Sequence, residues 1–287
     1  MDNYLLERRL RENSTDLHRR VAESIFVLQT MLTKYLDRFP DFTDHSTLHC
    51  MTVLDFCNRI IGEDQISRLC PEECYVLIMA CYLHDIGMGI NSRDFQEFSK
   101  ELDIAGYLKE NEGADEADIV RAFHNEYSGL FIRKYAHLFD IPSEELTRAI
   151  IQVARGHRKT DLLDRSEFGD IKAGDATIRT AYLSAVMRLA DEIDVASDRN
   201  PILLFNTNKL TAMKDKIEFG LHESIKHVEL DDNAITLYAR PKTPEYGPLI
   251  EKLAKKISDT LIYCREASEK MSDMRIRQNK VVIRRAE

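Results

Sequence analysis

Residues 71–89 have the sequence PEECYVLIMACYLHDIGMG, and this stretch decides the fold class. A proline in the first turn, followed by two glutamates, is typical of the N-terminus of a helix. Residues 75–83 are apolar on nearly every side of such a helix, which predicts a central, buried helix. Glycines at positions 87 and 89 predict that the helix ends beside the adjacent pair His84 and Asp85.

Helical patterns extend in both directions from this stretch. Apolar residues recur at helical spacing in the segments 15–38, 46–61, 116–139, 143–155 and 177–197, and a polar loop is predicted at 161–175. The first of these helices is expected to stop before Pro40, because a residue that precedes proline is biased away from helical angles. The second is expected to end at Gly62.

The pattern changes after residue 200. Short alternating segments predict strands at 216–221, 226–230 and 234–239, with a hairpin turn at 231–233 and a final helix from about residue 246. We therefore expect a mainly α fold in three parts. Residues 1–200 are expected to form a helical domain, residues 201–240 a small antiparallel β appendage, and residues 241–287 a C-terminal helix that packs back or oligomerises.

Composition narrows the class of protein. The chain has 287 residues, of which 44% are hydrophobic, so it can bury a substantial core. No apolar run approaches the ~20 residues that a membrane helix needs, and the charged N-terminus lacks the apolar region of a signal peptide, so we expect a soluble, cytoplasmic protein. The six cysteines form no C-x-x-C pair and predict no disulfide framework. A net charge of −9 lowers the expectation of nucleic-acid binding.

An ordered series of histidines and aspartates carries the chemistry. Its members are His49, His84 with Asp85, His124, His157 and Asp191, separated by steps of 35, 40, 33 and 34 residues. Each step has about the length of a helical hairpin, so a helix bundle can bring one residue per helix to a common level. Imidazole and carboxylate together suit divalent transition metals, which predicts a metal centre.

The series H…HD…H…H…D resembles the HD-domain metal-dependent phosphohydrolase superfamily over roughly residues 40–200. The most specific pieces are the segments HCMTV at 49–53, LHDIG at 83–87 and LADEIDVASDR at 189–199. The last of these is similar to the closing segment of the HD-GYP branch. The chain departs from that branch in having Met88 where a lysine is usual, no GYP triplet and no second histidine beside His157.

The resemblance implies an HD-type helical bundle with one or two divalent ions per chain, of Mn, Fe, Zn or Ni. It implies one ion held by His49, His84, Asp85 and Asp191, and a second held by His124 and His157 with Asp85 bridging. If only one ion is bound, His124 or His157 is free to act as general acid to the leaving oxygen. The catalytic residues expected are His124, Asp85 and Arg158.

Two further residues are expected to hydrogen-bond to metal ligands, namely His45 and Asp194. His45 lies one helical turn before His49, and its roles as a ligand or as a helix cap also stay open. Positive charge for an anionic substrate is expected from Arg155, Arg158, Lys159 and Arg199. The alternative for these four is that they are ordinary solvated cations.

The function that follows is a metal-dependent phosphohydrolase or phosphodiesterase acting on a nucleotide-type phosphate ester through metal-activated water. A non-catalytic, nucleotide-sensing or regulatory module is the first alternative, and a metal-dependent nuclease is the second. The expected partner is a small phosphate ester, with nucleic acid less favoured and no membrane association. A homodimer is one possible assembly.

Overall fold

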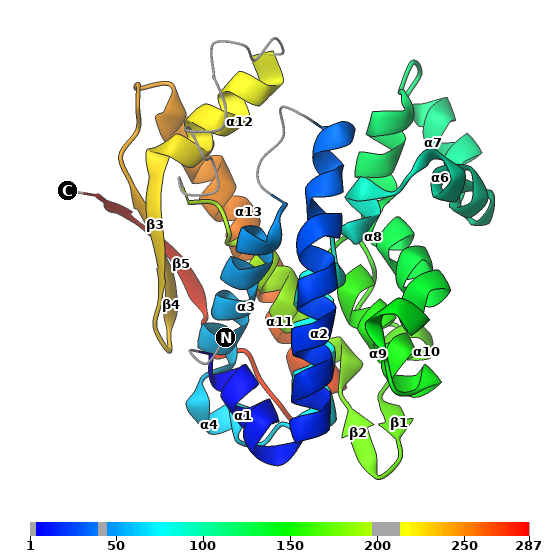
Figure 1. The fold of residues 1–287 in the computed structure, drawn as a ribbon. Helices are drawn as coiled ribbons and strands as arrows, with labels where there is room; N and C mark the ends of the chain where they lie inside the picture. Colours follow the sequence, from blue (N-terminus) through cyan, green and yellow to red (C-terminus); the bar gives the residue numbers. More distant parts are fainter. Residues whose placement is uncertain (1–3, 40–44, 197–212, 287) are drawn as a thin grey trace.

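The computed structural model describes residues 4–39, 45–196 and 213–286, and these residues form a mainly helical fold with two small sheets (Figure 1). The expected fold class is therefore confirmed. The boundary predicted at residue 200 and the predicted substrate residue Arg199 lie outside the described residues.

The predicted central helix is present as α5 (Pro71–Leu83). Every residue from Glu73 to Leu83 is buried. The Glu73 side chain accepts a hydrogen bond from the Cys70 backbone N–H at 3.1 Å, which caps the first turn. Helices on several sides cover α5, which explains why its sequence has no polar face.

The helices around α5 correspond closely to the predicted segments. They are α2 (Thr15–Met31), α3 (Thr47–Ile61), α8 (Glu116–Tyr135), α9 (Glu144–Arg155) and α11 (Thr180–Glu192). The 3₁₀ turns η1 (Leu32–Asp37) and η4 (Ala136–Phe139) extend α2 and α8. Gly62 ends α3 with φ 77°, a left-handed angle that favours glycine.

Several short elements were not predicted from the sequence. They are α1 (Leu5–Asn13), α4 (Glu63–Ile66), η2 (Ile86–Gly89), α6 (Ser92–Phe98), η3 (Ser99–Glu101), α7 (Ile104–Glu110), α10 (Arg165–Phe168) and the hairpin β1 (Ile171–Ala173) with β2 (Ala176–Ile178). The hairpin lies where a polar loop was expected. Its turn contains Gly174 at φ 59°.

The second sheet is only partly antiparallel. Strands β3 (Ile225–Leu230) and β4 (Ala234–Ala239) form the predicted hairpin, and β5 (Lys280–Arg285) pairs with β4 in parallel. The helix α13 (Tyr246–Met271) connects β4 to β5 and packs against α11 (Figure 1). Residues 280–285, which were expected to belong to the C-terminal helical part, thus form a strand in the sheet of the appendage.

One predicted strand is wrong. Residues 216–221 belong to the helix α12 (Met213–Ser224). Ile217 and Leu221 are four residues apart, so this short segment satisfies a helical period as well as strand alternation.

Polar contacts tie distant parts of the chain to α4 and α5. Arg179, just before α11, makes two hydrogen bonds of 2.7 and 2.6 Å to the buried carboxylate of Glu73. After α13, the backbone of Arg275 exchanges hydrogen bonds with the side chain of Gln65 at 2.9 and 3.1 Å. Asp273 accepts a hydrogen bond from Arg68 at 2.7 Å, so the last part of the fold closes over its first third.

Within residues 4–39, 45–196 and 213–286, no single helix has the length and apolar character to cross a bilayer. One pair of segments, Pro71–Gly89 and Ser92–Glu101, meets those criteria of length and composition only when joined, and it is bent by 100°.

Candidate metal centre

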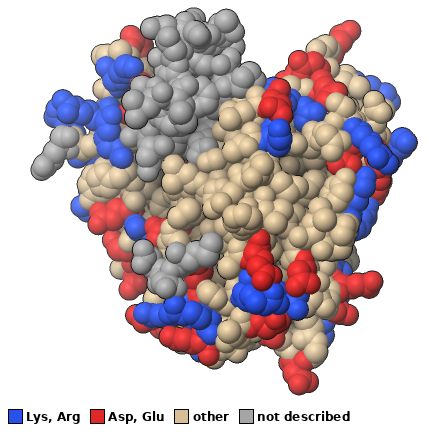
Figure 2. All heavy atoms as spheres, in the orientation of Figure 1, with Lys and Arg blue, Asp and Glu red and all other residues tan. Residues whose placement is uncertain are grey.

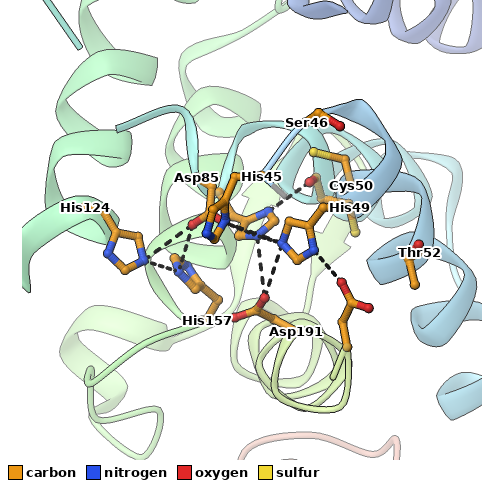
Figure 3. Close-up of polar contacts among 12 residues, drawn as sticks. His45, Ser46, His49, Cys50, Thr52, Asp85, His124, His157 and Asp191 are labelled. Atoms are coloured by element: carbon orange, nitrogen blue, oxygen red, sulfur yellow. Dashed lines mark hydrogen bonds and ion pairs between the residues drawn. The ribbon is translucent and has the colours of Figure 1, made fainter. Parts of the chain in front are cut away.

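The structure brings the six predicted metal ligands into one buried cluster (Figure 3). They come from α3 (His49), the end of α5 (His84 and Asp85), α8 (His124), the turn after α9 (His157) and the last turn of α11 (Asp191). Five segments that are far apart in the sequence therefore meet at one level of the helix bundle, as the spacing predicts.

The end of α5 explains how two adjacent residues face the same centre. His84 keeps helical angles (φ −61°, ψ −35°), whereas Asp85 leaves the helix with φ −104° and ψ 7°. The change of direction brings His84 Nε2 within 3.2 Å of Asp85 Oδ2. Two neighbours inside a regular helix would instead diverge by about 100°.

Gly87 holds this turn against α8 through close contact. A Cβ atom at Gly87 would lie 2.3 Å from the backbone oxygen of His124 and 2.6 Å from the backbone nitrogen of Ser128. The Gly87 N–H donates to Ser128 Oγ at 2.9 Å, and that hydroxyl donates to the His84 carbonyl at 2.5 Å. The glycine is thus required for the approach of two backbones and not for a left-handed angle.

The first half of the cluster contains His49, His84 and Asp191. The two Nε2 atoms of the histidines lie 3.1 Å apart. Asp191 Oδ1 lies 3.4 Å from His49 Nε2 and 3.8 Å from His84 Nε2. All three ligand atoms therefore face a common point.

The second half contains Asp85, His124 and His157. The Nε2 atoms of His124 and His157 lie 3.0 Å apart, and Asp85 Oδ1 lies 3.4 Å from the first and 3.6 Å from the second. The other oxygen of Asp85, Oδ2, faces the first half, at 3.2 Å from His84 Nε2. One carboxylate thus stands between the two halves.

The four histidines of the cluster share one orientation. Each directs Nε2 inward and donates a hydrogen bond from Nδ1 to a fixed acceptor outside the cluster. The acceptors are Asp194 Oδ2 for His49 (2.6 Å), the Cys81 carbonyl for His84 (2.9 Å), the Arg121 carbonyl for His124 (2.8 Å) and the Ala154 carbonyl for His157 (2.5 Å). This arrangement fixes the tautomer with the lone pair on Nε2, as metal-ligating histidines require.

The spacing of the donor atoms fits a divalent transition metal. Histidine nitrogens bind zinc at about 2.0–2.1 Å, so two of them at octahedral or tetrahedral angles lie about 2.8–3.4 Å apart. The inward nitrogens in the two halves are 3.1 and 3.0 Å apart. Mixed imidazole and carboxylate donors are also the set that such metals prefer over Mg²⁺ or Ca²⁺.

The electrostatics keep the ligands in their binding forms. Burial by itself would raise the pKa of Asp85, but His84 and His45 hold that pKa well below its ordinary value. The pKa of Asp191 is also held well below its ordinary value, against the effect of burial, by the neighbouring imidazoles of His49, His84 and His157. Burial lowers the pKa of both His124 and His157. Charged carboxylates and neutral imidazoles are the states that bind a cation.

The two residues expected to support the ligands lie where that role requires. Asp194 is buried and accepts the hydrogen bond from His49. His45 donates from Nδ1 to Asp85 Oδ2 at 2.7 Å, and its ring packs edge-on against Tyr35. His45, His49 and Asp85 also offer donor atoms within 4.8 Å of one another.

The cationic side chains predicted to bind substrate differ in whether an acidic residue neutralises them. Arg155 makes hydrogen bonds to Glu126 at 2.8 and 3.0 Å and to Glu167 at 2.6 Å, which neutralises it and points to a structural role. Arg158 and Lys159, next to His157, are exposed and make no ion pair with any residue in the described ranges.

Arg188, one turn before Asp191, was not predicted from the sequence to belong to the site. Its guanidinium donates to the carbonyls of Gly156 at 2.7 Å and Thr160 at 2.8 Å, and it lies over the ring of Tyr263 at 5.1 Å. Arg188 therefore holds the turn that carries His157. The only sequence signal for this role of Arg188 is its position three residues before Asp191, which places it one helical turn away from a metal ligand.

Comparison with known proteins gives one match. A family model described as HD-CE matches residues 39–266, a range that contains the whole cluster. No curated protein and no solved structure matches the chain.

Proposed function

The chain belongs to the HD-CE family, an HD-domain family, and on that basis we propose that it is a metal-dependent phosphohydrolase or phosphodiesterase acting on a nucleotide-type phosphate ester. The proposal rests on one observation above all. Two groups of ligand atoms share Asp85, whose two oxygens face different histidine pairs.

The proposed first metal position is held by His49, His84, Asp191 and Asp85 Oδ2, and the second by His124, His157 and Asp85 Oδ1. Divalent ions at such positions supply positive charge beside a phosphoryl group and make water more acidic at neutral pH. The chain holds the donors rigidly, because each histidine is anchored through its other nitrogen.

The geometry favours His124 as a ligand over its alternative role as general acid. Its Nδ1 proton is engaged by the Arg121 carbonyl, and its Nε2 faces Asp85 and His157. Since burial lowers its pKa, His124 is mostly neutral at pH 7 and has no second proton to deliver to a leaving oxygen.

We assign the first contact with the substrate phosphate to Arg158. It follows the ligand His157 directly, is exposed, and has no acidic partner in the described part of the chain. An arginine is suited to this task because its planar guanidinium can donate two parallel hydrogen bonds to phosphate oxygens. Lys159 adds charge beside it.

The test is a count of bound metal together with hydrolysis of bis(p-nitrophenyl) phosphate. We expect about two transition-metal ions per chain, and a loss of both metal and hydrolysis in Asp85→Asn. Asp55→Asn is the matched control, because Asp55 pairs with Arg59 on the surface of α3. Hydrolysis that survives in Asp85→Asn would contradict the proposal.

Single histidine variants separate the two positions. We expect His124→Ala and His157→Ala to retain the first ion and lose the second, while the exposed His137→Ala retains both. Full metal content with no turnover of any phosphate ester would instead favour a binding or regulatory module.

A further inference from the structure

A basic groove lies between α13 and Arg188 of α11, the helix that also carries the ligand Asp191. It has a volume of about 470 Å³, and its lining includes Arg188, Lys252, Lys255, Lys256, Asp259 and Tyr263. We name it the α13 groove. Four of these six side chains are cationic and one is acidic, in a chain whose net charge is −9.

The lysines belong to the outer face of α13. Positions 252, 255, 256 and 259 follow one another at helical spacing, so their side chains lie together. The inner face carries Ile257 and Leu261, which are buried in the core. The cations are therefore presented to solvent by a helix that is fixed in place.

Much of this charge is not neutralised. Lys252 makes no ion pair with any residue in the ranges 4–39, 45–196 and 213–286. Lys255 approaches its neighbour Asp259 at 3.3 Å in a largely exposed pair, which is a weak interaction. Lys256 binds Glu192 at 2.8 Å.

Two contacts link residues of the groove to segments that carry metal ligands. Glu192, the partner of Lys256, directly follows the ligand Asp191. Arg188, which lines the groove, holds the turn that carries His157 and the exposed Arg158 and Lys159. Arg188 thus connects the groove to the turn that carries His157, and Lys256 reaches the residue beside Asp191.

We propose that the α13 groove binds the phosphate chain of a nucleoside polyphosphate whose scissile phosphoryl group lies at the metal centre. The inference rests on the proposed function and narrows its substrate class. A pocket of this size suits a small ligand better than a polymer, which would need a longer basic track. Concentrated positive charge in an acidic chain also attracts small polyanions selectively.

The test uses a double charge reversal that leaves the Lys256–Glu192 pair in place. Lys252→Glu with Lys255→Glu is compared with Lys100→Glu with Lys109→Glu, which changes the net charge equally at exposed lysines near α7. Binding of inorganic tripolyphosphate to the chelator-treated full chain is measured by calorimetry. We expect the groove variant to bind about ten-fold more weakly, since each exposed contact contributes modestly, and the control variant to match the wild type.

Kinetics on the protein as isolated give a second readout. The groove variant should raise KM for a nucleoside triphosphate and leave kcat/KM for p-nitrophenyl phosphate unchanged, because that substrate has no phosphate chain. Tripolyphosphate binding that is unchanged in the groove variant, or equally weakened in the control, would overturn the inference. Selective loss of binding in a protein that hydrolyses no ester would overturn the proposed function and leave the groove as a polyphosphate site.

Discussion

Gly87→Ala is expected to damage the metal centre without touching a ligand. The new Cβ would lie 2.3 Å from the His124 carbonyl oxygen, whereas real Cβ atoms essentially never come within 3.0 Å of such an atom. The η2 turn and α8 must therefore separate by about 0.7 Å. The two nearest atoms, the His124 carbonyl oxygen and the Ser128 backbone nitrogen, belong to the backbone, so no rotation of a side chain can relieve the contact.

This movement would pull the two halves of the metal cluster apart, because the turn and α8 carry ligands of different halves. His84 and Asp85 precede the turn, and His124 lies on α8, so their donor atoms move apart by a comparable distance. Overpacking of this kind costs about 2 kcal/mol of unfolding free energy, which for a chain of this length is roughly 3–4 °C in Tm. A displacement near 1 Å in a site that positions reacting groups lowers the rate by about 10²-fold.

The assay combines calorimetric unfolding, metal content and hydrolysis of bis(p-nitrophenyl) phosphate. Gly247→Ala is the matched control, because a Cβ there would meet no atom within 4 Å and Gly247 has no left-handed φ. We expect that variant to keep its metal, activity and stability. A Gly87→Ala protein with two bound ions and full activity would refute the reasoning from close contact.

Three further outcomes are expected. Asp194→Asn, which replaces the charged acceptor of a 2.6 Å hydrogen bond to a cluster imidazole, should lower metal affinity about 10–100-fold in a chelator competition; unchanged affinity would contradict this. Arg179→Met leaves the buried Glu73 carboxylate unpaired and should cost about 3–5 kcal/mol in urea unfolding, whereas Arg59→Met at an exposed pair should cost under about 1 kcal/mol. Burial holds the pKa of His157 well below its ordinary value, so its contribution to stability is present above about pH 6.5 and is lost as the pH falls. The urea midpoint of the metal-free protein should therefore fall below that pH, and less steeply in His157→Gln; a midpoint that is flat between pH 7.5 and 5.5 would count against it.

The long helices could be predicted because their signals are local. The segment 46–61 begins with a serine that caps its first turn and ends at a glycine with a left-handed angle, and the structure has Thr47–Ile61. The run of apolar residues 75–83 leaves no polar face for solvent, so it predicted a buried helix, and the structure has α5 there. The regular steps between the histidines and aspartates predicted a shared level, and the structure brings all six residues together.

What could not be predicted depends on partners far away in the sequence. The strand β5 exists because β4, about 40 residues earlier, offers it an edge, and no pattern within residues 280–285 identifies that partner. Residues 216–221 are too short to distinguish a helical from a strand period. The role of Gly87 likewise depends on the backbone of α8.

The contacts that join residues 273 and 275 to Gln65 and Arg68 have a consequence for the order in which the fold is completed. A ribosome that adds roughly 5–20 residues per second needs about 5–20 s to proceed from Asp191 to β5. During that interval all six residues of the cluster have been synthesised, but the segment that bonds to Gln65 and Arg68 has not. The segment after α13 therefore closes over α4 and α5 in a later step than the synthesis of the cluster residues.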